Sequence, residues 1–212
     1  DQLLIGQNVL FDQINNRIKS AITLVSNQNV DGQKVTSSPE VLKELLATLT
    51  RFKDFTNYGQ KDLFLDKKPL KLSHVTDDCI ELSKQNIKQK PVVIKNHIKQ
   101  TSLTVLADSE MLHKVIYYLL QRAISLTENG EVVVTADNVG KFTKISIRDT
   151  ALGVDEQSLR TVLSKKGLIQ VSDTLEGDAL LIAKILVENH GGRITATANP
   201  YHGSIVSFTL PS

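Results

Sequence analysis

The sequence predicts an α+β protein in which an N-terminal antiparallel helical hairpin, forming a four-helix bundle in a dimer, precedes an α/β sandwich with a mixed sheet. Two observations on the 212-residue chain predict this fold class. Apolar residues recur at three- and four-residue spacing up to about residue 60, which is typical of amphipathic helices. Beyond that point short strand-like runs alternate with helical stretches, and turn signals join two pairs of runs into hairpins.

The helical hairpin is expected in residues 1–62. A first helix is predicted from Val9 to Val25, and Ser38 with Pro39 supplies a cap and a favoured first-turn residue for a second. The two apolar stripes are too wide for a single hairpin to bury, so two chains are expected to pair as a four-helix bundle. We therefore predict a homodimer with an interface that includes Leu10, Ile14, Ile18, Leu42, Leu45, Leu49 and Phe52.

The second domain is expected in residues 63–212, where strands and helices alternate. Strands are predicted at 70–72, 92–97 and 103–107, helices at 73–88, 111–126 and 178–189, and hairpins at 131–136 with 142–148 and at 193–198 with 205–210. Ser73 and Asp108 are placed as helix caps, because their side chains can accept hydrogen bonds from first-turn amides. Asp178 is either a helix cap or a negative charge that would repel a triphosphate. Helices on one face of a mixed sheet give an α+β sandwich.

The composition excludes several classes of function. The 25 basic and 23 acidic residues leave a net charge of +2 and are dispersed, so binding to nucleic acid is not expected. No apolar run approaches the ~20 residues needed to cross a bilayer, and no signal-peptide pattern is present. The segment is therefore expected to be cytoplasmic, without membrane contact. Cys79 lies in an apolar helical stripe and is interpreted as a small buried hydrophobe.

Residues 185–194, Ile-Leu-Val-Glu-Asn-His-Gly-Gly-Arg-Ile, join a predicted helix to a predicted strand through two glycines. They resemble the segment that closes the ATP-binding domain of sensor histidine kinases, where Val-Glu-x-His-Gly-Gly ends a helix. The run 149–154 is similar to that family's first glycine box, and 12–18 to its H box. The resemblance implies a dimerisation and phosphotransfer hairpin, a GHKL (Bergerat-type) ATPase domain, and the cytoplasmic part of a longer sensor.

The same resemblance implies that the phosphoryl-transfer residues are replaced. Asp12 occupies the position of the phosphoacceptor histidine. Arg122, Tyr118 and Ser125 match a magnesium-coordinating asparagine, a second asparagine and a lysine. A guanidinium cannot ligate a metal and repels one. No metal site is therefore expected, and binding of ATP and Mg²⁺ is expected to be weak or lost, which leaves no cofactor.

Part of a nucleotide site is kept. Asp149 matches the aspartate that binds the adenine amino group. The vestigial nucleotide-binding residues implied by the resemblance are Asp149, Gly153, Gly177, Arg122 and Tyr118. Two alternatives stay open: Tyr118 and Arg122 either fill the vacated pocket or lie on an exposed helix face, and Asp149 either binds a ligand or only accepts backbone hydrogen bonds. Residues 161–174 correspond to the lid over ATP.

These replacements favour a non-catalytic, histidine-kinase-like signalling module, a pseudokinase of two-component signal transduction. It is expected to dimerise and to bind a response regulator or another signalling protein through its helical bundle. The alternative is an atypical histidine kinase-like protein that retains ATP binding through Asp149 and Arg122.

Overall fold

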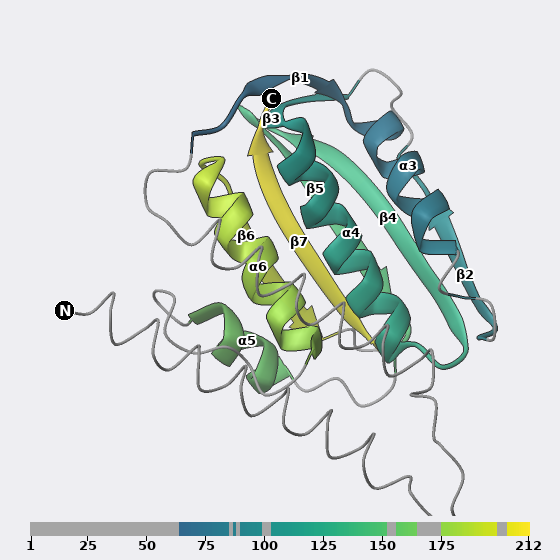
Figure 1. The fold of residues 1–212 in the computed structure, drawn as a ribbon. Helices are drawn as coiled ribbons and strands as arrows, with labels where there is room; N and C mark the ends of the chain where they lie inside the picture. Colours follow the sequence, from purple (N-terminus) through teal and green to yellow (C-terminus); the bar gives the residue numbers. More distant parts are fainter. Residues whose placement is uncertain are drawn as a thin grey trace, which may run out of the picture.

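Helices α3, α4 and α6 lie on one face of a mixed five-stranded sheet (Figure 1). This computed structural model describes residues 64–84, 87, 90–98, 103–151, 156–164, 175–198 and 203–212. The elements are β1 (Lys67–Lys71), α3 (Leu72–Lys84), β2 (Val92–Asn96), β3 (Thr104–Asp108), α4 (Ser109–Leu126), β4 (Gly130–Val139), β5 (Phe142–Asp149), α5 (Glu156–Ser164), α6 (Leu175–Asn189), β6 (Arg193–Ala198) and β7 (Ser204–Pro211). The predicted hairpin of residues 1–62, with Asp12 and the predicted dimer interface, lies outside the described residues.

The sheet has the order β2-β4-β5-β7-β6, with β2 parallel to β4 and the remaining pairs antiparallel. A separate antiparallel ribbon of β1 and β3 lies at one end of the helices (Figure 1). The prediction of a mixed sheet with helices on one face is therefore confirmed. The two hairpins, β4 with β5 and β6 with β7, are those that the turn signals predicted.

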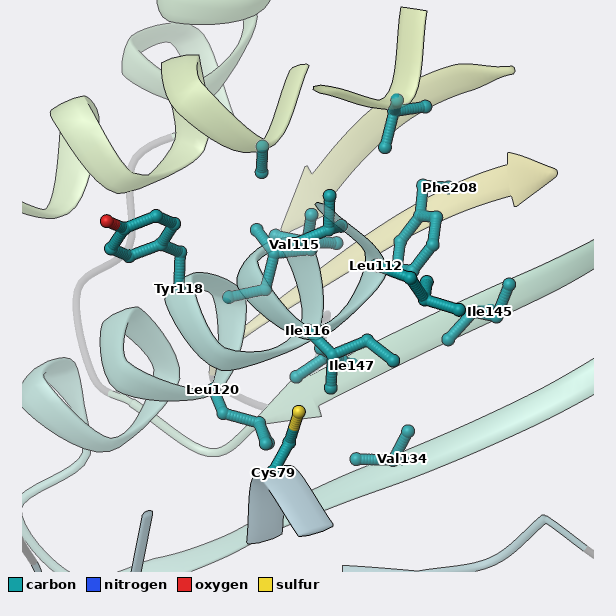
Figure 2. Packing of buried hydrophobic residues seen from close by; sticks show 14 of the residues in the cluster. Cys79, Leu112, Val115, Ile116, Tyr118, Leu120, Val134, Ile145, Ile147 and Phe208 are labelled. Carbon is teal, nitrogen blue, oxygen red and sulfur yellow. The ribbon is translucent and has the colours of Figure 1, made fainter. Parts of the chain in front are cut away.

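The core lies between α4 and the inner face of the sheet. Figure 2 shows side chains of α4, including Leu112 and Ile116, directed toward Ile145, Ile147 and Phe208 of the sheet. These five side chains are at most 1% exposed. Strand residues of β5 alternate between this core and the outer face, as the period of two in a strand requires. Cys79 is fully buried, as expected, and burial raises the pKa of its thiol to about 12.

Both ends of α4 are closed by side chains. Asp108 is its N-cap, and a carboxylate oxygen accepts a hydrogen bond from the Met111 amide at 3.1 Å, which confirms the predicted cap. At the other end the Thr127 hydroxyl donates to the Ala123 carbonyl at 2.7 Å. Lys90 donates to the Ser125 carbonyl at 2.8 Å, where a cation also complements the helix dipole. Both ends of α4 are therefore held by hydrogen bonds with side chains.

Several predicted boundaries are wrong. The helix predicted to start after Ser73 begins at Leu72, so Ser73 is inside α3, which ends at Lys84. α6 begins at Leu175, so Asp178 lies within the helix and is not its cap. α5 was not predicted; in it Leu159 is buried, and Val162 and Leu163 are only partly buried against the core.

Candidate functional site

The segment Val187–Gly192 closes α6 in a glycine-dependent turn. The Gly191 amide donates to the Glu188 carbonyl at 2.9 Å and the Gly192 amide to the Val187 carbonyl at 3.0 Å, which is the Schellman pattern. Gly191 has a φ of +83°. A Cβ on Gly192 would lie 1.8 Å from the Thr209 carbonyl oxygen, so only glycine permits this approach of β7.

His190 uses both ring nitrogens within this turn. Its Nδ1 lies 2.7 Å from the Leu186 carbonyl oxygen, and its Nε2 accepts a hydrogen bond from the Asp108 amide at 3.0 Å. These partners require the neutral ring with its proton on Nδ1. Burial lowers the pKa of His190, although the Leu186 carbonyl opposes this shift. The histidine of the Val-Glu-Asn-His-Gly-Gly run thus joins the end of α6 to the start of α4.

A buried polar cluster lies where α4 crosses the ends of β5 and β7. It consists of Arg122 from α4, Asp149 at the end of β5, and Ser204 at the start of β7. The antiparallel pairing of Arg148 with Ile205 places Asp149 beside Ser204. Arg122 is 5% exposed, Asp149 1% and Ser204 0%, so all three are removed from water.

The carboxylate of Asp149 has four partners. Oδ1 accepts from the backbone amides of Ser204 at 2.9 Å and Ala151 at 3.1 Å. Oδ2 accepts from the Ser204 hydroxyl at 2.6 Å and forms an ion pair with Nη1 of Arg122 at 3.6 Å. The same Nη1 donates to the Ser204 hydroxyl oxygen at 3.2 Å. An ionised carboxylate offers about four acceptor sites, and hydrogen bonds engage three of them while the ion pair adds charge compensation.

The structure brings together Arg122 and Asp149 from the predicted site residues. Tyr118 lies one turn earlier on α4, is 8% exposed, and its ring centroid is 6.1 Å from that of Tyr117. The interpretation of Tyr118 and Arg122 as residues of an exposed helix face is therefore wrong, because this side of α4 packs within the domain. Asp149 accepts two backbone hydrogen bonds at the end of its strand, as the second alternative expected, and it also accepts one from the Ser204 hydroxyl.

The other predicted residues are not joined to this cluster by any contact that the structure describes. Gly177 lies in the first turn of α6, and Gly153 falls outside the described residues. Of the predicted lid segment, residues 161–164 belong to α5. Ser204 had no predicted role. The available signal was its place at the start of the last strand, opposite the end of the strand that carries Asp149.

Neither a metal cluster nor a membrane-spanning helix occurs in the part of the chain that the structure describes. Within those residues no three His, Cys, Asp or Glu side chains come together as metal ligands. None of the described helices has the length and apolar character needed to cross a membrane.

The family is shown by sequence comparison. The sequence profile of the family described as histidine kinase-, DNA gyrase B- and HSP90-like ATPase matches residues 107–212, which is half of the chain. The chain belongs to this family. This assigns α4, α6, strands β4 to β7 and the cluster around Asp149 to a histidine kinase-like ATPase domain.

Curated relatives of this ATPase domain include sensor kinases. Adaptive-response sensory kinase SasA of Synechococcus sp. (strain CC9902) is 30% identical over 125 residues, which are 57% of this chain and 33% of that protein. Sensor protein TorS of Escherichia coli (strain K12) is 24% identical over 192 residues, which are 87% of this chain and 20% of that protein. The chain thus spans a third or less of the length of these two relatives.

Solved structures of histidine kinases share the fold. Acinetobacter baumannii histidine kinase AdeS aligns with a TM-score of 0.70 and 15% identity, covering 95% of this chain and 96% of that chain. Histidine kinase ThkA in complex with response regulator protein TrrA aligns with a TM-score of 0.72 and 19% identity, covering 95% of this chain and 60% of that chain. At these identities the likeness concerns the fold.

Proposed function

We propose that this chain is a non-catalytic, histidine-kinase-like signalling module that dimerises and binds a response regulator or another signalling protein. The observation that carries the proposal is the buried ion pair between Arg122 and Asp149. The residue that the family resemblance assigns to adenine is paired with the residue that it assigns to the magnesium ligand. The residues of this site therefore fit each other better than they fit Mg·ATP.

The energy of the ion pair, compared with that of a hydrogen bond to adenine, favours this interpretation. Separating a buried ion pair costs roughly 3–5 kcal/mol when one partner is withdrawn. A hydrogen bond from an adenine amino group to the carboxylate contributes only about 1.5–3 kcal/mol. An adenine base that displaced Arg122 from Asp149 would thus lose more than it gained. A guanidinium also has no lone pair to offer a metal, so Arg122 cannot act as the ligand that the family uses.

The lack of a phosphoacceptor histidine in residues 1–62 also supports the proposal. None of the five histidines, His74, His97, His113, His190 and His202, falls within residues 1–62, and the resemblance places Asp12 at the phosphoacceptor position. His190 has both ring nitrogens within hydrogen-bond distance of backbone groups, so its ring serves the fold. The chain therefore offers no histidine in its predicted helical hairpin to receive a phosphoryl group.

A signalling partner is favoured by the kind of protein to which the chain is similar. The solved structure of ThkA holds a response regulator, TrrA, and its fold aligns with 95% of this chain. The apolar stripes before residue 60 favour a homodimer, because one hairpin does not bury them. We propose that the dimeric bundle is the surface that meets the partner.

Calorimetry with and without Mg²⁺ tests the loss of nucleotide binding. We expect Mg·ATP to bind with a dissociation constant above about 1 mM, since ~4 kcal/mol of binding energy corresponds to that affinity. Labelled ATP should give no acid-labile phosphorylation of the chain. Micromolar affinity that strengthens with Mg²⁺ would overturn the proposal. Micromolar affinity without Mg²⁺ that disappears in Arg122→Ala would favour the atypical ATP-binding protein instead.

Light scattering tests the dimer. The wild-type chain should have the mass of two copies at tens of micromolar, and Leu45→Asp with Leu49→Asp should give one copy, because each buried leucine contributes roughly 1.5–3 kcal/mol. Purified receiver domains of response regulators can then be titrated against both proteins. Binding that is equal for the wild type and the monomeric variant would argue against the bundle as the partner surface.

A further inference from the structure

We propose that Asp149 and Ser204 form a guanidinium-binding site whose resident ligand is Arg122, and that this occupancy is what excludes an adenine base from the carboxylate. The statement about adenine rests on the proposed function, whereas the preference for a guanidinium does not. The ligand class of the site is a cation with N–H donors, such as a guanidinium.

The acceptor side of the site is held in place without Arg122. Three of the four contacts to the Asp149 carboxylate come from Ser204 and Ala151, and two of these are backbone amides. The backbone of Gly203, with a φ of +91°, approaches so closely that an added Cβ would lie 2.1 Å from the Asp149 carbonyl oxygen. β7 is thereby fixed against the end of β5. The carboxylate and the hydroxyl should keep their geometry when the arginine side chain is removed.

The donor side is one guanidinium nitrogen, whose positive charge complements the carboxylate. Nη1 of Arg122 donates a hydrogen bond to the Ser204 hydroxyl oxygen at 3.2 Å. The same nitrogen forms an ion pair with Oδ2 of Asp149 at 3.6 Å. The Ser204 hydroxyl already donates to Oδ2 and therefore presents a lone pair to the guanidinium. A neutral base can supply N–H groups but cannot neutralise a carboxylate that is 1% exposed.

Removal of the arginine side chain should leave a negatively charged space of guanidinium shape. In Arg122→Ala a free methylguanidinium ion can restore both the charge and the donors. N-Methylurea has nearly the same shape but no charge, and tetramethylammonium has the charge but no donors. These two compounds separate recognition of a guanidinium from filling of a cavity and from screening by salt.

The experiment compares melting temperatures of the wild type and Arg122→Ala in each compound. Loss of one partner of a buried ion pair in a domain of this size should lower the melting temperature by roughly 10 °C. Methylguanidinium at concentrations on the order of tens of millimolar should return several degrees to Arg122→Ala and none to the wild type. Equal effects of methylguanidinium and N-methylurea on the variant would overturn the proposal.

A second set of variants applies if Arg122→Ala does not fold. Arg122→Met keeps most of the side-chain volume without the guanidinium. If Arg122 serves as the ligand of Asp149, Asp149→Asn should destabilise the Arg122→Met background much less than it destabilises the wild type. Strictly additive effects, or an Arg122→Met variant as stable as the wild type, would show that Arg122 contributes only packing.

Adenosine, which carries no phosphate, tests the exclusion of the base. It should bind Arg122→Ala detectably at millimolar concentration, and binding should be lost when Asp149→Asn is added or when methylguanidinium is present. Adenosine binding to the wild type as tight as to Arg122→Ala would overturn the exclusion. This outcome is distinct from failure of the proposed function, which is reported by Mg·ATP binding or autophosphorylation of the wild type.

Discussion

The Ser204→Ala variant isolates one hydroxyl of the buried cluster. The change removes the 2.6 Å hydrogen bond to Asp149 and the 3.2 Å acceptor for Arg122, but it keeps the backbone amide bond to Oδ1 at 2.9 Å. A hydrogen bond to a charged group contributes about 1.5–3 kcal/mol, and a buried donor that loses its acceptor adds about 1 kcal/mol or more. We therefore expect the free energy of unfolding to fall by about 3 kcal/mol.

Ser207→Ala is the matched control for this measurement. Ser207 lies on the same strand, and its hydroxyl is 2.9 Å from that of Ser146, so the lost bond joins two neutral groups. This variant should cost about 1 kcal/mol or less. Urea unfolding of the three proteins gives both differences, with unchanged slopes as the check that the transition is the same. Equal losses for the two variants would refute the argument that Ser204 acts through charged partners.

Two further predictions concern the end of α6. Gly192→Ala should destabilise the domain far more than Gly140→Ala, because a Cβ on Gly192 meets the Thr209 carbonyl at 1.8 Å, whereas Gly140 has open space and only a φ of +64° to disfavour a side chain. Thermal melting checks this, and similar losses would contradict the reasoning. The lowered pKa of His190 favours its neutral form in the folded state, so its contribution should be complete above its ordinary pKa of 6.5 and decline as the pH falls below that value. Urea titrations between pH 5 and 8 (roughly the range in which histidine titrates) should therefore show a steeper loss toward acid for the wild type than for His190→Gln, and parallel curves would contradict this.

Local signals predicted much of the fold. The cap at Asp108 and the apolar stripe that follows it both lie within or next to α4, so local sequence was enough to predict this helix. The structure has that helix with that cap. The ribbon of β1 and β3 was not predicted as a pair, since it joins Lys67 to Asp108 across a helix and a further strand. The strand propensity of residues can predict that a segment forms a strand, but it does not identify a pairing strand that is distant in the sequence.

In the candidate site, too, local sequence predicted some features, whereas contacts between distant residues were not predicted. The sequence supplied Asp149 and Arg122 through a resemblance, yet it left open whether Arg122 is exposed. Arg122 follows Leu119 by three positions and so lies near the apolar stripe of α4, which was the signal for burial. Ser204 is 82 residues from Arg122 along the chain, and no local pattern joins them. The cluster exists because β5 and β7 pair, which only the folded sheet determines.

The order of strands has a consequence for how the domain is made. β7 is the last strand of this sheet along the sequence, but it lies between β5 and β6. During synthesis the ribosome therefore releases β6 before its neighbour exists, and α6 emerges before the interior strand that carries Phe208 and Leu210. The domain cannot assemble progressively from its N-terminal side, and nascent chains that stop short of β7 should remain substrates for chaperones and proteases.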